Sequence, residues 1–427
     1  MKVVEMMELF MQVLGMVITL LYLYQGVYTV VGLLFRVPRK KVREVELHRY
    51  AALISARNEE GVIGELVESL KKQNYPAELL DIYVVADNCT DRTAEAAQAA
   101  GATVYRRFDR VKVGKGYALD YLLKKLEADG LERQYEGYFV FDADNIVDPN
   151  FVSEMNKVYA RGGYTAVTGY RNSKNFGENW ISAGYSIWFL REARFLNGAR
   201  QALGLSCHVS GTGYLISAAY LRAKGGWPYH LLTEDLQFSA DCVAAGGKIG
   251  YCDRAVFYDE QPTSFRQSWD QRLRWSKGFF QVDRQYAPAL AKGMLKGGRR
   301  GFGCYDLLVF VSAGALMVAM GVCSWTVLLW ACMVAPANEL GHALTAMGMS
   351  LGAGVLRFYL GTMAYGLLIV LSEWRQIRAK PWEKLIYLGA FPIFMATYIP
   401  ITVTALFQKV EWKPIRHTSA ARMDSLG

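Results

Sequence analysis

Long apolar runs lie toward both ends of the chain, and a stretch of mixed composition lies between them. The first run, Leu9 to Phe35, contains no charged residue, and a helix of that length crosses a hydrocarbon core of about 30 Å. Three more apolar blocks follow near the other end, at 307–334, 340–371 and 385–407. The pattern predicts a globular domain that is anchored in a membrane on both sides.

A basic cluster directly follows the first apolar run. Its members are Arg36, Arg39, Lys40, Lys41 and Arg43. Because Lys and Arg are enriched in the cytoplasmic loops of membrane proteins, the cluster predicts that the central domain is cytoplasmic and that the chain is a multi-pass protein of the cell membrane. The run is too long for a signal peptide, and no small-residue cleavage site follows it.

The last two apolar blocks permit more than one topology. Arg357 lies in the middle of the third block, where a charge either snorkels to the interface or faces a protein-lined path for a polar substrate. The fourth block contains Pro392 and Pro400, which kink or end a helix. Basic clusters flank that block, and the charge rule favours both on the cytoplasmic side. The fourth block is therefore either a span or a re-entrant or interfacial segment.

Short apolar runs alternate with helical patterns in the first part of the central stretch. Four strands are predicted, at 50–55, 82–86, 103–106 and 138–142. This alternation is typical of an α/β domain with a mainly parallel sheet. Ligands of such sheets bind outside the carboxyl ends of the strands, so the residues that follow each strand are candidates for function.

Polar side chains follow three of these strands. They are Arg57 and Glu59 after the first, Asp87 after the second, and Asp142 and Asp144 after the fourth. Since Asp142 and Asp144 are one residue apart on extended backbone, both point to the same side. Two such carboxylates could share a hard divalent cation with a substrate diphosphate. An isolated pair of this kind is alternatively only a turn signal, but here the strand ends converge on one crevice.

Lys115 stands between two glycines at the start of the next helical segment. A lysine at a helix N-terminus could neutralise a phosphate, with help from backbone donors. The segment is not a Walker A loop, because the GxxxxGK[ST] spacing is absent. The alternative is a simple helix cap.

The triplet Thr233-Glu234-Asp235 lies among apolar residues. It offers a carboxylate for general-base catalysis. The alternative is a helix N-cap followed by acids of the first turn.

A helical segment further along the chain combines an amide, a cation and an aromatic ring. Gln271, Arg274 and Trp275 are spaced i, i+3 and i+4 and so share one helix face. The segment also fits an amphipathic helix on the membrane, with Phe265 and Trp269 as anchors. These two interpretations are compatible, because different faces of one helix can serve them.

An apolar stripe occurs between 175 and 201. Its members are Ile181, Tyr185, Trp188 and Phe195, with Arg191 and Arg194 beside them. A stripe of this kind predicts an interfacial helix at the cytoplasmic membrane surface, where an acceptor would arrive.

Composition narrows the functional classes. Among 427 residues, 48 basic and 39 acidic side chains give a net charge of +9, and 52% of residues are apolar, which excludes a disordered chain. The seven cysteines form no CxxC pair and are expected to be reduced. No nucleic-acid partner is predicted, because the basic residues cluster at the membrane borders. A nicotinamide dehydrogenase is disfavoured, since no GxGxxG follows the first strand.

Four short motifs occur in a fixed order between the N-terminal and C-terminal apolar regions. They are DNCTD at 87–91, DAD at 142–144, TED at 233–235 and QRLRW at 271–275. In this order the chain beyond residue 8 resembles the membrane-embedded family 2 glycosyltransferases of the cellulose, poly-N-acetylglucosamine and hyaluronan synthase group. The resemblance implies a GT-A (Rossmann-like) fold, a UDP-sugar donor, Mg²⁺ or Mn²⁺, and inversion at the anomeric carbon.

The resemblance also implies a role for each motif. Residues expected to bind the UDP-sugar are Arg57, Glu59, Asp87, Lys115 and Asp142, and those expected to bind the metal are Asp142 and Asp144. The expected catalytic residues are Asp235 as the base with Glu234 and Arg274, and the expected acceptor-binding residues are Gln271 and Trp275. The Ser210-Gly211-Thr212-Gly213 segment departs from the forms of some polymer synthases, which leaves the sugar and the linkage open.

The implied organisation has five parts. They are a transmembrane helix at 9–35, a GT-A domain at 45–260, amphipathic interface helices at 261–300, a transmembrane region at 305–408 and a basic tail at 409–427.

Three functions are consistent with this pattern. The first is a processive synthase that extends a β-linked polysaccharide and exports it through its own membrane segments. With so few spans, such a synthase would need a homo-oligomer or an accessory secretion subunit. The second is a glycosyltransferase that adds a single sugar to a membrane lipid. The third, a receptor without turnover, is disfavoured because it would not need Asp235.

Overall fold

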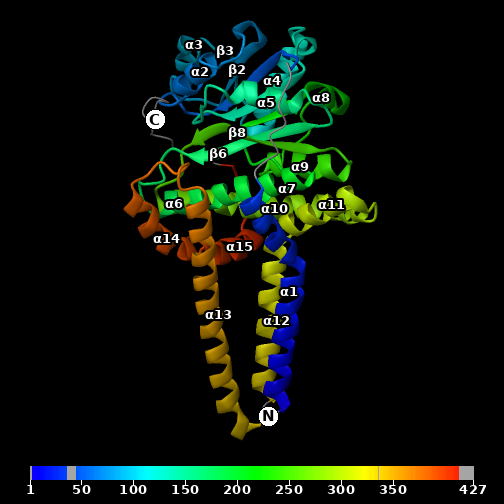
Figure 1. Ribbon diagram of the computed structural model, residues 1–427, viewed down its shortest axis with the longest axis vertical. Helices are drawn as coiled ribbons and strands as arrows, with labels where there is room; N and C mark the ends of the chain where they lie inside the picture. Colours follow the sequence, from blue (N-terminus) through cyan, green and yellow to red (C-terminus); the bar gives the residue numbers. More distant parts are fainter. Residues whose placement is uncertain (1, 36–44, 335, 413–427) are drawn as a thin grey trace.

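An α/β domain sits on three long helices in the computed structural model (Figure 1). The structure describes residues 2–35, 45–334 and 336–412. The basic cluster at 36–43 and the part of the predicted basic tail from 413 onward lie outside the described residues.

One mixed sheet forms the centre of the domain, with the strand order β3-β2-β1-β4-β7-β6-β8-β5. The strands are β1 (Tyr50–Ala56), β2 (Leu80–Asp87), β3 (Thr103–Arg107), β4 (Gly137–Asp142), β5 (Ile146–Val147), β6 (Ala166–Ser173), β7 (Tyr214–Ser217) and β8 (Ile249–Asp259). The four predicted strands are confirmed as β1 to β4, which pair in parallel. The second half is mixed, because β7 runs antiparallel to both β4 and β6.

Helices cover both faces of this sheet. They are α2 (Ile63–Lys71), α3 (Thr93–Ala100), α4 (Lys115–Ala128), α5 (Phe151–Tyr159), α8 (Ala218–Lys224), α9 (Glu234–Ala244) and the short helices η1 (Ala77–Leu79) and η2 (Glu132–Gln134). Alternate residues of β1 point to opposite faces. Ala51 and Leu53 join the core that includes α4, whereas Ala52 and Ile54 join the core that includes α2 and α5.

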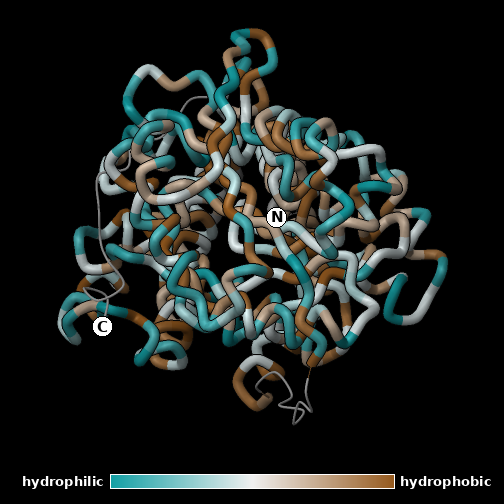
Figure 2. Tube along the Cα trace, turned by 90° about the horizontal axis from the view of Figure 1, so that it is seen from above, coloured by the Kyte–Doolittle hydropathy of each residue, from teal (hydrophilic) through white to brown (hydrophobic). Residues whose placement is uncertain are grey.

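The remaining helices lie on the side of the domain from which the long apolar helices extend. They are α1 (Lys2–Leu34), α6 (Trp180–Arg191), the π-helix η3 (Glu192–Gly198), α7 (Ala199–Leu203), α10 (Phe265–Met294), α11 (Gly298–Val311), α12 (Ala313–Val334), α13 (Ala337–Ser372), α14 (Pro381–Ala396) and α15 (Tyr398–Phe407). Seen from above, hydrophobic segments concentrate toward the middle of the molecule, and many peripheral loops are hydrophilic (Figure 2).

Four segments are long and apolar enough to cross a membrane, namely 5–34, 313–334, 340–372 and 381–407. The first three correspond to α1, α12 and α13, which extend away from the domain in one direction (Figure 1). The fourth is divided at Thr397 into α14 and α15, which lie crosswise close to the domain (Figure 1). This arrangement agrees with an interfacial segment, rather than a membrane span, for the fourth apolar block.

The prediction of a membrane-surface helix at 175–201 was wrong in its placement. The helix α6 exists, but most of its side chains are buried within the protein, and α14 packs against it so closely that a Cβ on Gly184 would meet the Phe394 ring at 2.5 Å. A helix that is apolar on most sides is a buried helix. The helix on the outside of the protein at this place is therefore α14, and α6 lies beneath it.

Candidate active site

A cavity of about 430 Å³ extends from the carboxyl ends of the parallel strands to the helices of the membrane side. All the site residues predicted from the sequence line it: Arg57, Glu59, Asp87, Lys115, Asp142, Asp144, Glu234, Asp235, Gln271, Arg274 and Trp275. At its other end the lining includes Gln25 of α1, Ala313 of α12 and Thr402 of α15. The fold thus joins the predicted polar residues to the apolar helices in one space.

The sheet register explains why the strand ends converge. Ser55 is the register partner of both Val85 on β2 and Asp142 on β4, so the three strands end at the same edge. Just beyond them, Asn58 and Asn88 adopt left-handed backbone conformations, with φ of 57° and 54°. Such φ values are uncommon outside glycine and occur most often for Asn and Asp in tight turns. These turns direct the chain around the cavity mouth.

A buried ion pair lies beside the cavity at the ends of β2 and β3. Arg107 donates from Nη1 to Asp87 Oδ1 at 2.5 Å, and both side chains are buried. Burial raises the pKa of Asp87, although Arg107 opposes that change. Arg107 was not predicted. The only signal in the sequence is a basic residue at the end of the third strand, next to the strand that carries Asp87.

Arg57 and Trp412 meet at the same end. The guanidinium carbon of Arg57 lies 5.3 Å from the centroid of the Trp412 ring, and both residues line the cavity. Arg57 Nε is buried without a hydrogen-bond partner among the described residues, as are Thr233 Oγ1 and Gln271 Oε1. Unsatisfied buried polar atoms are rare in proteins, so three of them around one cavity indicate a site built for a polar ligand.

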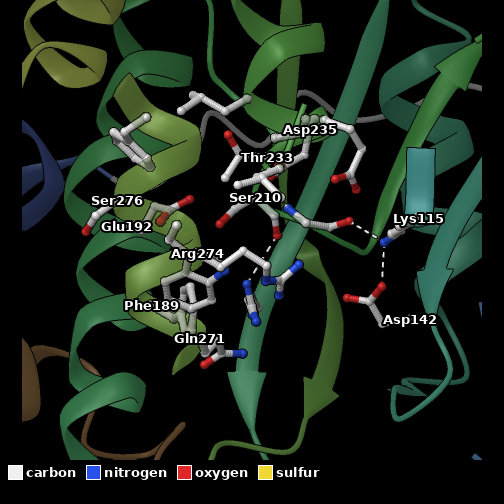
Figure 3. Close-up of a pocket in the computed structure, with 18 of the residues that line it drawn as sticks. Lys115, Asp142, Phe189, Glu192, Ser210, Thr233, Asp235, Gln271, Arg274 and Ser276 are labelled. Carbon is white, nitrogen blue, oxygen red and sulfur yellow. Dashed lines mark hydrogen bonds and ion pairs between the residues drawn. The ribbon is translucent and has the colours of Figure 1, made fainter. Parts of the chain in front are cut away.

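Gly211 links the predicted base to the predicted phosphate-binding lysine. Its N–H donates to Asp235 Oδ2 at 2.5 Å, and its carbonyl accepts a hydrogen bond from Lys115 Nζ at 2.7 Å. Lys115 Nζ also donates to Asp142 Oδ1 at 2.5 Å (Figure 3). Gly211 has a φ of +75°, a conformation that glycine adopts without the steric cost of a Cβ. Lys115, placed at the first residue of α4, therefore neutralises Asp142.

Asp142 and Asp144 are the carboxylates that the sequence predicts as metal ligands. Both line the cavity, and Asp144 Oδ2 accepts a hydrogen bond from the Glu260 N–H at 2.8 Å. Within the described part of the chain, no three His, Cys, Asp or Glu side chains converge as a complete ligand set. A hard cation such as Mg²⁺ takes only one or two carboxylates from a protein and completes its shell with phosphate oxygens and water. The two aspartates fit that kind of site.

The TED triplet begins α9, with Glu234 as its first residue. Burial raises the pKa of both Glu234 and Asp235, and like-charge repulsion from Asp235 raises the pKa of Glu234 further. Lys115 opposes the rise at both residues. The pair therefore holds a proton more readily than ordinary acids do, which suits a group that must accept one.

The QRLRW motif lies on α10, and its residues face two directions. Gln271, Arg274 and Trp275 line the cavity, as their spacing predicts. Arg272 points elsewhere and is fully buried. It packs 4.4 Å from the Phe394 ring centroid and donates from Nη1 to Thr397 Oγ1 at 2.6 Å. Arg272 thus fastens α10 to the break between α14 and α15.

Comparison with known proteins identifies the family. Residues 48–278, more than half of the chain, match the family described as "Glycosyltransferase like family 2". The chain belongs to this family. The resemblance to family 2 glycosyltransferases that was drawn from the four motifs is thereby confirmed.

Individual relatives include both lipid and polysaccharide enzymes. The chain is 26% identical over 297 residues to a beta-monoglucosyldiacylglycerol synthase of Nostoc sp., with 66% of this chain and 59% of that protein covered. It is 22% identical over 276 residues to a poly-beta-1,6-N-acetyl-D-glucosamine synthase of Staphylococcus epidermidis, covering 61% and 64% of the two chains. The chain spans 47% to 59% of the length of the glucosyldiacylglycerol synthases that it matches.

A solved structure shares the fold. A mannosyltransferase from Pyrobaculum calidifontis, in complex with GDP-Man and Mn²⁺, superposes with a TM-score of 0.54 at 16% identity, with 91% of this chain and 98% of that chain covered. The GT-A-like α/β fold predicted from the sequence is confirmed.

The site of this family 2 glycosyltransferase also contains three charged or polar residues that the sequence analysis missed. Arg171, Glu192 and His208 all line the cavity. His208 Nε2 lies 3.1 Å from Glu192 Oε1, and Arg171 stacks 3.5 Å from the Phe189 ring centroid. Burial alone would raise the pKa of Glu192, but His208 and Arg171 lower it below its ordinary value. The π-helical turn that carries Glu192 leaves no readable periodicity in the sequence.

Proposed function

We propose that this glycosyltransferase transfers one sugar from a nucleotide-sugar donor, of the UDP-sugar class, to a hydroxyl group of a membrane lipid. The observation that carries the proposal is the course of the cavity. It begins at the strand ends, where nucleotides bind in α/β sheets, and ends beside α1, α12 and α15, the helices on the side of the proposed membrane. An acceptor that enters from the membrane would meet the donor inside the protein.

The polar end of the cavity suits the donor. Arg57 and Asp87 lie where the nucleoside would rest, and Lys115 and Arg274 supply positive charge for its diphosphate. Asp142 and Asp144 would hold Mg²⁺ or Mn²⁺, which would offset negative charge on the diphosphate when bound. Lys115 would exchange its contact with Asp142 for the phosphate when the donor arrives.

Asp235 is the proposed catalytic base. It takes the proton of the acceptor hydroxyl while that oxygen attacks the anomeric carbon, and the bond from that carbon to the nucleotide diphosphate breaks. Arg274 interacts electrostatically with the carboxylates of Glu234, Asp142 and Asp235. It stabilises the negative charge that develops on the departing diphosphate. One attack from the opposite side inverts the anomeric configuration.

Two observations favour a lipid acceptor over a polymer. Arg357, which a polysaccharide path would use, lies exposed on α13 with its Nε donating to the carbonyl of Ala353. None of the described residues of α13 lines the cavity. Phe279, Phe310 and Ala313, which do line it, are instead suited to contact acyl chains. Trp275, which lies 5.7 Å from the Tyr185 ring in an edge-to-face contact, would place the acceptor hydroxyl rather than the end of a polymer.

The proposed location is the cytoplasmic face of the cell membrane. The helices α1, α12 and α13 would anchor the protein, and α14 with α15 would lie in the interface. Arg272 would hold that interfacial pair against α10.

Product analysis tests the proposal. The purified chain is reconstituted in lipid nanodiscs that contain diacylglycerol and is given a panel of radiolabelled UDP- and GDP-sugars. We expect one UDP-sugar to label a lipid that carries a single sugar, with matching release of UDP. Label that elutes as a water-soluble polymer would support a processive synthase instead. Release of GDP alone would overturn the donor assignment.

A further inference from the structure

The transmembrane helix α1 carries a polar face that is unusual for a membrane anchor. Gln25 Oε1 accepts a hydrogen bond from Arg191 Nη2 at 2.8 Å, and Tyr28 donates to Asp306 Oδ2 at 2.7 Å. Thr29 and Tyr365 lie with their hydroxyl oxygens 3.4 Å apart. Polar side chains on an otherwise apolar anchor helix are costly and often mark functional positions.

Arg191 and Glu192 face the membrane half of the cavity from the junction of α6 and the π-helix η3. Arg191 lies 4.8 Å from the ring centroid of Trp188, which also lines the cavity. In a regular helix consecutive residues point about 100° apart, yet both Arg191 and Glu192 reach the same space. The change from α- to π-helical geometry occurs at this point, and such turns are frequent at functional sites.

A buried chain of polar groups fixes Glu192 in place. Glu192 Oε1 lies 3.1 Å from His208 Nε2, and His208 Nδ1 lies 2.7 Å from Arg200 Nη1. Arg200 makes a two-pronged ion pair with Asp306, at 2.6 and 2.8 Å. Asp306 is in turn bound by Tyr28 of α1. This series of polar contacts connects the cavity wall to the membrane anchor, and so it holds α1 and Glu192 in a fixed position relative to each other.

We infer that Gln25, Trp188, Arg191 and Glu192 form the binding site for the headgroup of the acceptor, and that this headgroup is neutral and hydroxylated. The inference rests on the proposed lipid acceptor. A guanidinium donates hydrogen bonds to hydroxyl oxygens, and a carboxylate accepts them from hydroxyl protons. A phosphate would gain from Arg191 but would be repelled by Glu192, so the paired charges select against anionic lipids. Phe279, Phe310 and Gly314, which line the same half of the cavity, leave an apolar surface for the acyl chains.

Photo-crosslinking measures lipid binding at this site independently of sugar transfer. The full chain in nanodiscs is labelled with a photoactivatable diacylglycerol, in competition with unlabelled diacylglycerol or phosphatidate of the same acyl chains. We expect diacylglycerol to compete at a concentration about tenfold lower than phosphatidate, and Arg191→Gln or Glu192→Gln to weaken labelling about tenfold, as loss of one charge-assisted hydrogen bond predicts. Matched controls are Arg133→Gln, whose side chain is 88% exposed, and Glu127→Gln on the exposed side of α4.

The selectivity between phosphatidate and diacylglycerol distinguishes loss of headgroup recognition from damage to the fold. Glu192→Gln should improve the competition by phosphatidate relative to diacylglycerol, because it removes the repelling charge, whereas a misfolded cavity would weaken both equally. Equal competition by the two lipids in the wild type, or wild-type labelling in both variants, would overturn the inference. If the wild type binds diacylglycerol as expected but produces only polymer, the headgroup site stands and the proposed transfer to lipid fails.

Discussion

The carboxylate of Asp235 accepts a hydrogen bond from the backbone N–H of Gly211 at 2.5 Å. The carbonyl of the same glycine accepts a hydrogen bond from Lys115, which also binds Asp142. One residue of the Ser210–Gly213 segment therefore joins the proposed base to the proposed metal and phosphate site. We expect binding of the donor at Lys115 and orientation of the base to be coupled through this residue.

The pH dependence of transfer should reflect the raised pKa of the Glu234 and Asp235 pair. The base works only when ionised, so kcat/KM should fall as pH falls through a pKa above the ordinary value for aspartate, which is about 3.9. Because Lys115 lowers the pKa of both acids, Lys115→Met should move this acidic limb to higher pH. The exposed Lys124→Met serves as the control. A limb that stays in place in Lys115→Met would contradict the coupling.

Sugar transfer should depend on a divalent cation that Asp142 and Asp144 bind. We expect chelation by EDTA to abolish transfer and added Mg²⁺ or Mn²⁺ to restore it. Asp144→Asn should lower kcat by about a hundredfold or more, since one of the two carboxylate ligands is lost. Binding of Mn²⁺, followed by its paramagnetic resonance signal in the presence of UDP, should weaken in parallel. Full activity in EDTA, or unchanged Mn²⁺ binding in the variant, would remove the metal assignment.

The buried ion pair between Arg200 and Asp306 should stabilise the attachment of α1. Burial raises the pKa of Asp306, but Arg200 and Tyr28 outweigh that effect and lower it below its ordinary value. A lowered pKa gives stability that is present above the unfolded-state pKa of about 3.9 and is lost as pH falls through the folded-state value.

Asp306→Asn should therefore lower the free energy of unfolding by about 3–5 kcal/mol at neutral pH, because it leaves Arg200 buried without its counter-charge. Thermal unfolding of the wild type and the variant checks this, with the exposed Asp270→Asn as control. The difference between wild type and variant should shrink below about pH 4. A constant difference across pH would show that the effect is packing rather than charge.

The parallel half of the sheet was predictable because each strand is a short apolar run with polar residues at its carboxyl end. Asp87, Asp142 and Asp144 could be assigned to one crevice, since parallel strands end at a common edge. Spacing on one helix likewise placed Gln271, Arg274 and Trp275 together.

Other features depend on contacts between distant segments. The sequence shows no sign that Glu192 meets His208 or that Arg200 meets Asp306, because their pairing requires η3, α7 and α11 to be packed. The stripe at 181–195 was interpreted as a membrane surface because an apolar face does not reveal what covers it. In the structure α14 covers it.

Asp235 is proposed to catalyse the transfer of one sugar to a lipid in this cavity, and Asp235→Asn removes the proposed base while leaving the shape of the side chain nearly unchanged. Wild type, Asp235→Asn and the Asp270→Asn control are reconstituted with diacylglycerol and radiolabelled UDP-sugar, and label in a lipid with one added sugar is measured together with UDP affinity. We expect Asp235→Asn to bind UDP like the wild type and to lose transfer by about a factor of a thousand or more. Transfer near the wild-type rate in Asp235→Asn, or a polymeric product from the wild type, would contradict the proposal.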